Sequence, residues 1–143
     1  INPEGYKNIW WTVGGAGANL PPDDQWIQLA KGVNGCNGIA FDIESNLNID
    51  KVNTWIAKYK NSIPSNWKLI AIYHAGVPIP ENNGKFDYVC PMLYYGNQSY
   101  AVNHMDFTTG GNSGNELYEL ALKWPAYKTL FSFPNVVGVA GCP

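Results

Sequence analysis

Two carboxylates, Asp42 and Glu44, stand two residues apart at the end of the apolar segment 37–44. Alternate side chains of a strand point to opposite faces, so both acids would share one face while Ile39, Phe41 and Ile43 cover the other. Acids on an otherwise apolar strand are costly unless their face opens onto a solvated cleft. Parallel α/β proteins place such clefts at the carboxyl ends of strands. The pattern predicts a site there in which two carboxyl groups lie close together, so that their mutual repulsion raises the pKa of one and keeps a proton available near neutral pH.

The elements that would position these acids alternate along the chain. Gly/Pro-bounded apolar runs predict strands at 8–13, 38–44, 67–73, 86–95 and 127–133. Amphipathic spacing predicts helices at 23–33, 50–61 and 114–123, the first with Trp26, Ile27 and Ala30 on one face. Strands separated mostly by helices predict an α/β fold with a parallel sheet and right-handed crossovers. We therefore expect one α/β domain, residues 1–143, with about five βα units.

Composition narrows the class of protein. Charged residues make up only 14% of the chain, the net charge is −2, and all nine basic residues are Lys. Without Arg, the bidentate contacts typical of nucleic-acid readers are not available, so we expect no nucleic-acid partner. No run approaches the roughly 20 apolar residues of a membrane span, so we expect no membrane insertion. A surface made polar by uncharged residues suits a secreted protein and contact with carbohydrate.

Neither a metal nor a cofactor is expected. His104 has no partner at the spacing of metal ligands, and Cys36, Cys90 and Cys142 fit no zinc pattern. His74 is expected to be a polar residue at a strand end without a catalytic role. The three cysteines leave two arrangements open, which are one disulfide with a free thiol or three buried thiols. The chain begins at Ile1 and shows no signal-peptide pattern, so we expect it to be processed or to be part of something longer.

Three motifs, in order, resemble the chitinase-type family 18 glycoside hydrolases. That family carries Ser-x-Gly-Gly after its third strand, where this chain has Thr12-Val13-Gly14-Gly15. Its fourth strand carries Asp-Gly-x-Asp-x-Asp-x-Glu, which segment 37–44 matches at Gly38, Asp42 and Glu44. Its sixth strand carries Met-x-Tyr-Asp, which Met92-Leu93-Tyr94 matches at the first three positions.

The resemblance implies a (β/α)8 TIM barrel of which this chain supplies strands three to seven. A whole barrel needs about 250 residues and eight strands. A partial barrel would expose two sheet edges. We therefore expect either the remainder of the barrel or self-assembly with another chain to cover those edges.

By the same resemblance, Glu44 would be the general acid and then the base that activates water. Asp42 would orient the substrate's N-acetyl group, and Tyr94 would donate a hydrogen bond to its carbonyl oxygen. The residues expected to line the sugar site are Gly14, Gly15, Tyr73, Met92 and Tyr95. Structural alternatives exist, since Asp42 and Glu44 could be a strand-end cap and a solvated loop residue, and Gly14-Gly15 a tight turn.

The implied function is a secreted glycosidase that hydrolyses β-1,4-linked N-acetylglucosamine polymers by a substrate-assisted, retaining mechanism. Two departures from the family pattern favour an alternative, an inactive glycan-binding or extracellular structural protein. Ala40 stands where the family has its middle Asp, and Tyr95 stands where it has the Asp of the sixth-strand motif. An assembly module is a third hypothesis, should the 143 residues be the full mature chain.

Overall fold

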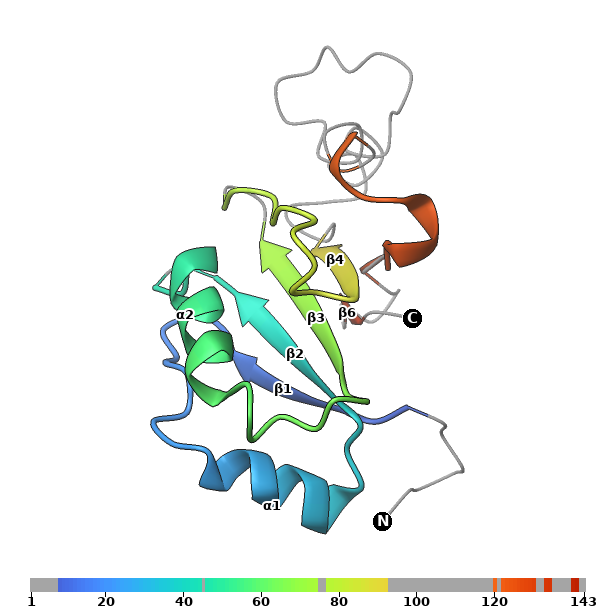
Figure 1. The fold of residues 1–143 in the computed structure, drawn as a ribbon. Coiled ribbons are helices and arrows are strands. Elements are labelled where there is room, and N and C mark those ends of the chain that lie inside the picture. Colours follow the sequence, from blue (N-terminus) through green and yellow to red (C-terminus); the bar gives the residue numbers. More distant parts are fainter. Residues whose placement is uncertain are drawn as a thin grey trace.

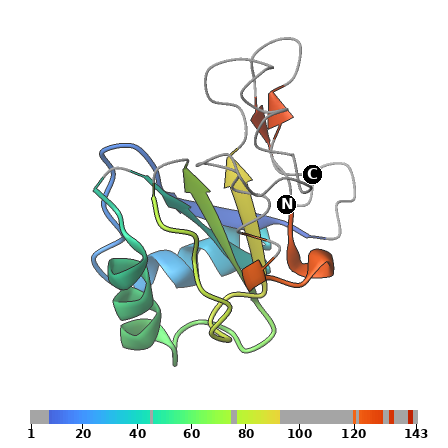
Figure 2. The same cartoon turned by 90° about the horizontal axis from the view of Figure 1, so that it is seen from above.

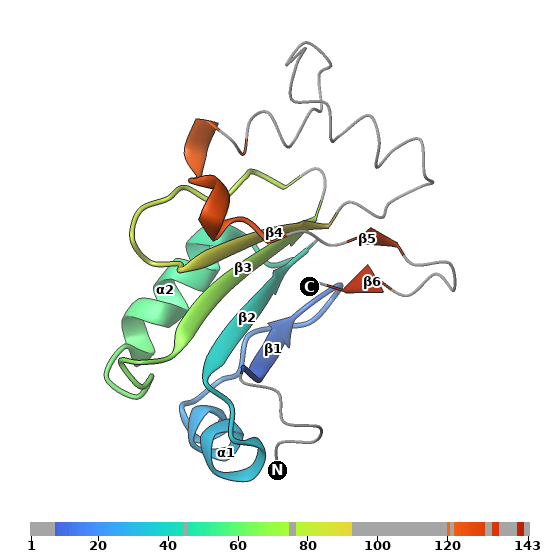
Figure 3. The same ribbon diagram turned by 90° about the vertical axis from the view of Figure 1, so that its right-hand side faces the viewer.

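The computed structural model describes residues 8–44, 46–74, 77–92, 120, 122–130, 133–134 and 140–141. Four parallel strands form one sheet in the order β1-β2-β3-β4, which is also their order in the chain (Figure 1). Two helices connect the first three strands, and a short antiparallel pair, β5 and β6, lies near the C-terminus (Figure 3). The bounds are β1 Trp10–Gly14, α1 Gln25–Asn34, β2 Gly38–Ile43, α2 Ile49–Tyr59, β3 Lys68–His74, β4 Tyr88–Met92, a 3-10 turn η2 at Ala126–Lys128, β5 Phe133–Pro134 and β6 Ala140–Gly141. The α/β fold with a parallel sheet is therefore confirmed.

The core lies between one face of the sheet and the helices (Figure 2). The odd-numbered side chains of β2, namely Ile39, Phe41 and Ile43, are at most 1% exposed. They pack in one cluster with Ile27 and Ala30 of α1 and with Val52, Trp55 and Ile56 of α2. Phe41 meets the ring of Trp55 edge-on, with centroids 5.7 Å apart. The alternation expected for this strand is thus present, because both helices cover the same face.

Two sequence expectations about the elements were wrong. Trp26 does not join Ile27 and Ala30 on the buried face of α1 but is 48% exposed, since it lies on the outer side of the helix. The strand expected at 127–133 is interrupted at its start by η2, in which the Lys128 N–H donates to the Pro125 carbonyl at 2.9 Å. Thr129 then makes a single parallel bridge to Val89 of β4. Pro125 favours the tight turn because its fixed φ suits the start of such a turn.

The β3–β4 connection crosses the core face without a helix among its described residues, 77–87. Its Phe86 is 3% exposed and meets Phe41 edge-on. The Trp124 indole N–H donates to the Pro80 carbonyl at 2.7 Å, which ties the segment around Trp124 to this loop. Leu120 and Trp124 complete the core on that side. The predicted helix at 114–123 is described only at Leu120, Leu122 and Lys123, all of which are helical.

Gly38, one of the motif positions, has a packing role at the amino end of β2. A Cβ at Gly38 would lie 2.7 Å from the Lys68 carbonyl oxygen and 2.7 Å from Cδ1 of Trp10. Its absence leaves room for the Trp10 indole over β2, and this ring stacks on Tyr88 of β4, on the far side of β3, with ring centroids 6.3 Å apart. The glycine therefore allows two non-adjacent strands to share an aromatic contact.

Among the described residues, Cys90 is disulfide-bonded and Cys36 is a free thiol. Of the two arrangements that the sequence left open, the one with a disulfide is present. Burial raises the pKa of the Cys36 thiol, because the apolar surroundings disfavour the thiolate.

We expect Gly38→Ala to lower the free energy of unfolding by about 1–3 kcal/mol, because the new methyl group must displace either a backbone carbonyl or the Trp10 ring. Gly32→Ala is the matched control. Gly32 lies in α1 with open space around it, so the substitution should stabilise the protein by up to about 1 kcal/mol. Urea unfolding of both variants measures the difference, and equal effects would contradict this role of Gly38.

The Cys36 thiol also gives a pH prediction. The unfolded chain releases this proton at lower pH than the folded chain, so the contribution of Cys36 to stability is present below the unfolded pKa and is lost as pH rises through the folded pKa. The stability difference between the original chain and Cys36→Ala should therefore shrink as the pH rises above about 8.5, the ordinary pKa of a cysteine thiol. Urea unfolding on both sides of this pH tests it, and a constant difference would contradict the raised pKa.

Candidate active site

The candidate site lies at the carboxyl edge of the sheet, where Asp42 occupies the next-to-last position of β2. The register pairs Gly14 with Asp42 and Asp42 with Ile72, and Ile72 in turn pairs with Cys90. These residues belong to four adjacent strands and form one row across the sheet. Asp42 is half-buried, and its parity places it on the face opposite the helices. The sheet therefore brings segments separated by up to 76 positions to one edge.

Gly14 and Gly15 lie directly against Asp42. The Gly15 N–H donates to the Asp42 carbonyl at 2.8 Å. A Cβ at Gly15 would lie 3.4 Å from Oδ2 of the Asp42 carboxylate, and a Cβ at Gly14 would lie 2.6 Å from the Asp42 carbonyl oxygen. Both glycines have positive φ, +94° and +103°. The first and second motifs thus meet in space, and the glycine pair lets the backbone of β1 approach the carboxylate closely.

Glu44 follows the last residue of β2 and is half-buried. Its carbonyl accepts a hydrogen bond from the Leu47 N–H at 2.7 Å, which closes a tight turn. Asn48 then caps α2, since its side chain accepts a hydrogen bond from the Lys51 N–H at 2.9 Å. A Cβ at Gly14 would lie 2.7 Å from Cδ2 of Leu47, so Leu47 packs against the end of β1. The turn holding Glu44 is therefore fixed at both ends.

The structure separates the other predicted site residues into two groups. Met92, at the end of β4, lies on the same face of the sheet as Asp42 and is 2% exposed. Tyr73 lies on the other face of the sheet, where it is fully buried in the hydrophobic core beside the helices. The geometry does not bring Tyr73 to the face that carries Asp42. Tyr94 and Tyr95 lie outside the described residues, as does His104.

Ala40, which the expected family 18 motif would replace with Asp, is 2% exposed on the same face as Asp42. Its register neighbours are Thr12 of β1 and Ile70 of β3. Asn37, at the position of the first Asp, lies at the opposite end of β2 from Asp42. Its side-chain oxygen accepts from the Ile9 N–H at 2.9 Å, and its amide donates to Asn8 Oδ1 at 3.0 Å. Asn37 therefore links the amino end of β2 to the residues just before β1.

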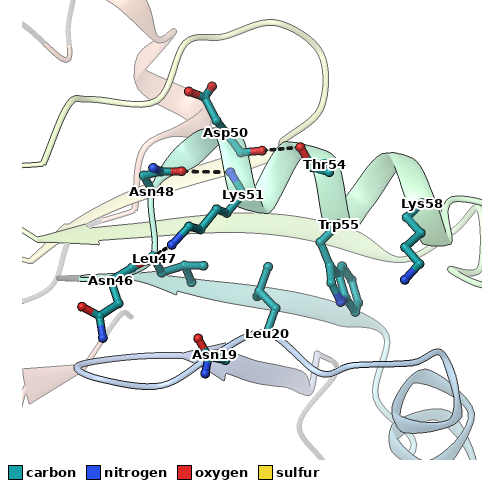
Figure 4. Close-up of a pocket in the computed structure, with 10 residues that line it drawn as sticks. All are labelled: Asn19, Leu20, Asn46, Leu47, Asn48, Asp50, Lys51, Thr54, Trp55 and Lys58. Carbon is teal, nitrogen blue, oxygen red and sulfur yellow. Dashed lines mark hydrogen bonds between the residues drawn. The ribbon is translucent and has the colours of Figure 1, made fainter.

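Sequence reasoning missed a groove next to this edge. It lies between the β1–α1 loop and α2, has a volume of about 460 Å³, and includes Asn46 and Leu47 from the turn after Glu44 (Figure 4). The only signal in the sequence was the pair Asn46 and Asn48 after the acidic strand, which also fits a turn and a helix cap. The groove depends on two segments that are distant in the chain, so no local pattern reveals it.

Within the described ranges, no three His, Cys, Asp or Glu side chains gather as a metal site would require. The described helices include none with the length and apolar content needed to cross a membrane. Comparison of the chain with protein-family models, curated proteins and solved structures finds no match.

We expect Gly14→Ala to destabilise the protein by about 2 kcal/mol or more, because the methyl group combines a positive φ with a clash against the Asp42 backbone. Gly17→Ala isolates the cost of placing a side chain at a positive φ. Gly17 also has a positive φ, +74°, but nothing lies within 4 Å of its would-be Cβ, so the loss should be about 1 kcal/mol. Thermal unfolding measures both losses. A smaller loss at Gly14 than at Gly17 would show that β1 does not press against Asp42.

Proposed function

We propose that this chain is the central part of a chitinase-like (β/α)8 barrel that hydrolyses β-1,4-linked N-acetylglucosamine polymers. The observation that carries the proposal is the meeting of Gly14-Gly15 with Asp42 at the carboxyl edge of the sheet. The two motifs that resemble family 18 are separated in sequence by more than twenty residues. Their contact in space is what a shared site requires.

The strand order supports the barrel. Strand order equals chain order, and α1 and α2 lie on one face of the sheet. Singly wound sheets of this kind are typical of (β/α)8 barrels, whereas doubly wound folds reverse direction at a switch point and carry helices on both faces. The parallel bridge between Val89 and Thr129 continues the same direction beyond β4. In this proposal the face of Asp42 is the barrel interior, and further strands cover the sheet edges.

In the proposed reaction, Glu44 protonates the glycosidic oxygen as the bond to the anomeric carbon breaks and its electron pair goes to that oxygen. The substrate's own acetamido oxygen attacks the anomeric carbon, giving a positive oxazolinium ion. Asp42, half-buried beside Gly15, would orient the acetamido group and stabilise this charge. Glu44, now a carboxylate, would take a proton from the water that opens the ion. Tyr94 would donate to the acetamido oxygen, and Gly14, Gly15, Met92 and Tyr95 would line the sugar site.

The inactive glycan-binding alternative draws support from Ala40. This position is buried between Thr12 and Ile70, so no carboxylate from residue 40 stands beneath Asp42. A secreted or extracellular location is part of both proposals. The disulfide at Cys90 supports it, because disulfides persist in oxidising compartments.

Turnover of a chromogenic N-acetylglucosamine oligomer tests the proposal. Glu44→Gln removes the proton donor while keeping the side chain's size, so kcat should fall by about 10²–10⁴-fold. Glu81→Gln is the matched control. Glu81 is an exposed acid whose only described ion pair is with Lys123, and its replacement should leave kcat unchanged.

Saccharide binding without turnover in the original chain would support the inactive alternative instead. Turnover that persists in Glu44→Gln would contradict the assigned role of Glu44.

The same assay should include Asp42→Asn. We expect a smaller loss of kcat than for Glu44→Gln, because the amide can still orient the acetamido group but carries no charge.

A further inference from the structure

The groove beside the candidate site has the build of a ligand pocket. Its volume of about 460 Å³ falls within the roughly 300–1,000 Å³ of small-ligand sites. Its floor is apolar, with Leu47 and Trp55 almost fully buried and Leu20 half-buried. Figure 4 shows Leu20 and Trp55 pointing into the space between α2 and the β1–α1 loop. Such a floor favours a ligand with an apolar face.

Three exposed asparagines, Asn19, Asn46 and Asn48, provide the polar groups of the groove. Across the part of the chain that the structure describes, the side-chain amides of Asn19 and Asn46 make no hydrogen bond. The Asn48 oxygen caps α2, which leaves its NH₂ group to donate. The amides of Asn19 and Asn46 each offer two donors and an acceptor, and that of Asn48 adds donors. Amides of this kind match hydroxyl and acetamido groups, which also donate and accept.

The charged residues of the groove do not single out an ionic ligand. The Lys51 ammonium donates to the Asn46 carbonyl at 2.7 Å, and the Lys58 ammonium lies 4.9 Å from the centre of the Tyr59 ring. Asp50 adds an opposite charge to the same lining. Both ammonium groups therefore contact the protein itself, and Asp50 offsets one of their two positive charges. The chemistry fits an uncharged polar ligand better than an anion.

The walls of the groove are held in place. The Trp55 indole N–H donates to the Pro21 carbonyl at 2.8 Å, and the Tyr59 hydroxyl donates to the Pro22 carbonyl at 2.6 Å. These bonds fasten the β1–α1 loop to α2. A pre-formed site loses less entropy on binding.

We infer that this groove is an auxiliary saccharide site that holds a neutral sugar unit of the same polymer. The sugar's apolar face would lie on Leu20, Leu47 and Trp55, and its polar groups would meet the three asparagines. The groove begins at Asn46, two residues after Glu44, and Leu47 packs against Gly14, so groove and candidate site share one turn. The identity of the sugar rests on the proposed function, whereas binding in the groove is measured separately from turnover.

The test uses ¹⁵N-labelled Glu44→Gln protein, in which the oligomer should remain intact. Titration with an N-acetylglucosamine hexamer should shift, saturably, the side-chain amide signals of Asn19, Asn46 and Asn48 and the Trp55 indole signal. The double variant Asn19→Ala/Asn46→Ala should weaken this binding at least fivefold. Asn66→Ala/Asn82→Ala, which removes two exposed asparagines outside the groove, should leave it unchanged.

The possible results distinguish saccharide binding in the groove from hydrolysis at the candidate site. Absence of shifts at the groove signals would overturn the groove inference even if the original chain turns over substrate. Groove shifts in a chain that shows no turnover would support the groove and contradict only the proposed hydrolysis. Tighter groove binding by a sulfated hexasaccharide than by the neutral hexamer would overturn the assignment of an uncharged ligand.

Discussion

The burial of one face of β2 is the constraint on which the rest of the structure depends. Ile39, Phe41 and Ile43 are sealed beneath α1 and α2, and they fix the register of the sheet. A slip of one residue would place Asp42 in this apolar core, at a large free-energy cost. The helices therefore decide, through three hydrophobic side chains, on which face the carboxylate lies.

The close approach of β1 to β2 fixes the position of Asp42 at the carboxyl edge of the sheet. Gly14 and Gly15 take positive φ values, and their lack of side chains lets the backbone lie against both Asp42 and Leu47. The same contact links Asp42 to the turn that carries Glu44, because Leu47 belongs to that turn. A single pair of glycines thus couples the two acids through packing. At the other end of β2, Gly38 and Asn37 serve the sheet itself, through Trp10 and through hydrogen bonds to residues 8 and 9.

The groove and the acidic edge share the turn that follows Glu44. The turn after Glu44 forms one end of the groove, and the fastened β1–α1 loop forms a wall. For an enzyme that acts on a polymer, contacts away from the reacting bond hold the chain in place and contribute to orientation. For a protein that only binds glycan, the same groove would be the recognition site. The same geometry would serve either proposed function, and the two proposals differ in the role they give Glu44.

The amino-acid sequence by itself determined the alternation of strands and helices and the face on which Asp42 would lie. It did so because hydrophobic spacing of two or of 3.6 residues leaves each element only one way to bury its apolar side. Only the tertiary structure decided what depends on distant segments. Tyr73 lies in the core rather than beside Asp42, since the parity of β3 is set by its pairing with β2. Thr129 makes one bridge instead of opening a full strand at 127, since Pro125 favours a turn. The contact of Gly15 with Asp42 and the groove between Leu20 and Trp55 exist because folding joins parts of the chain that share no local signal.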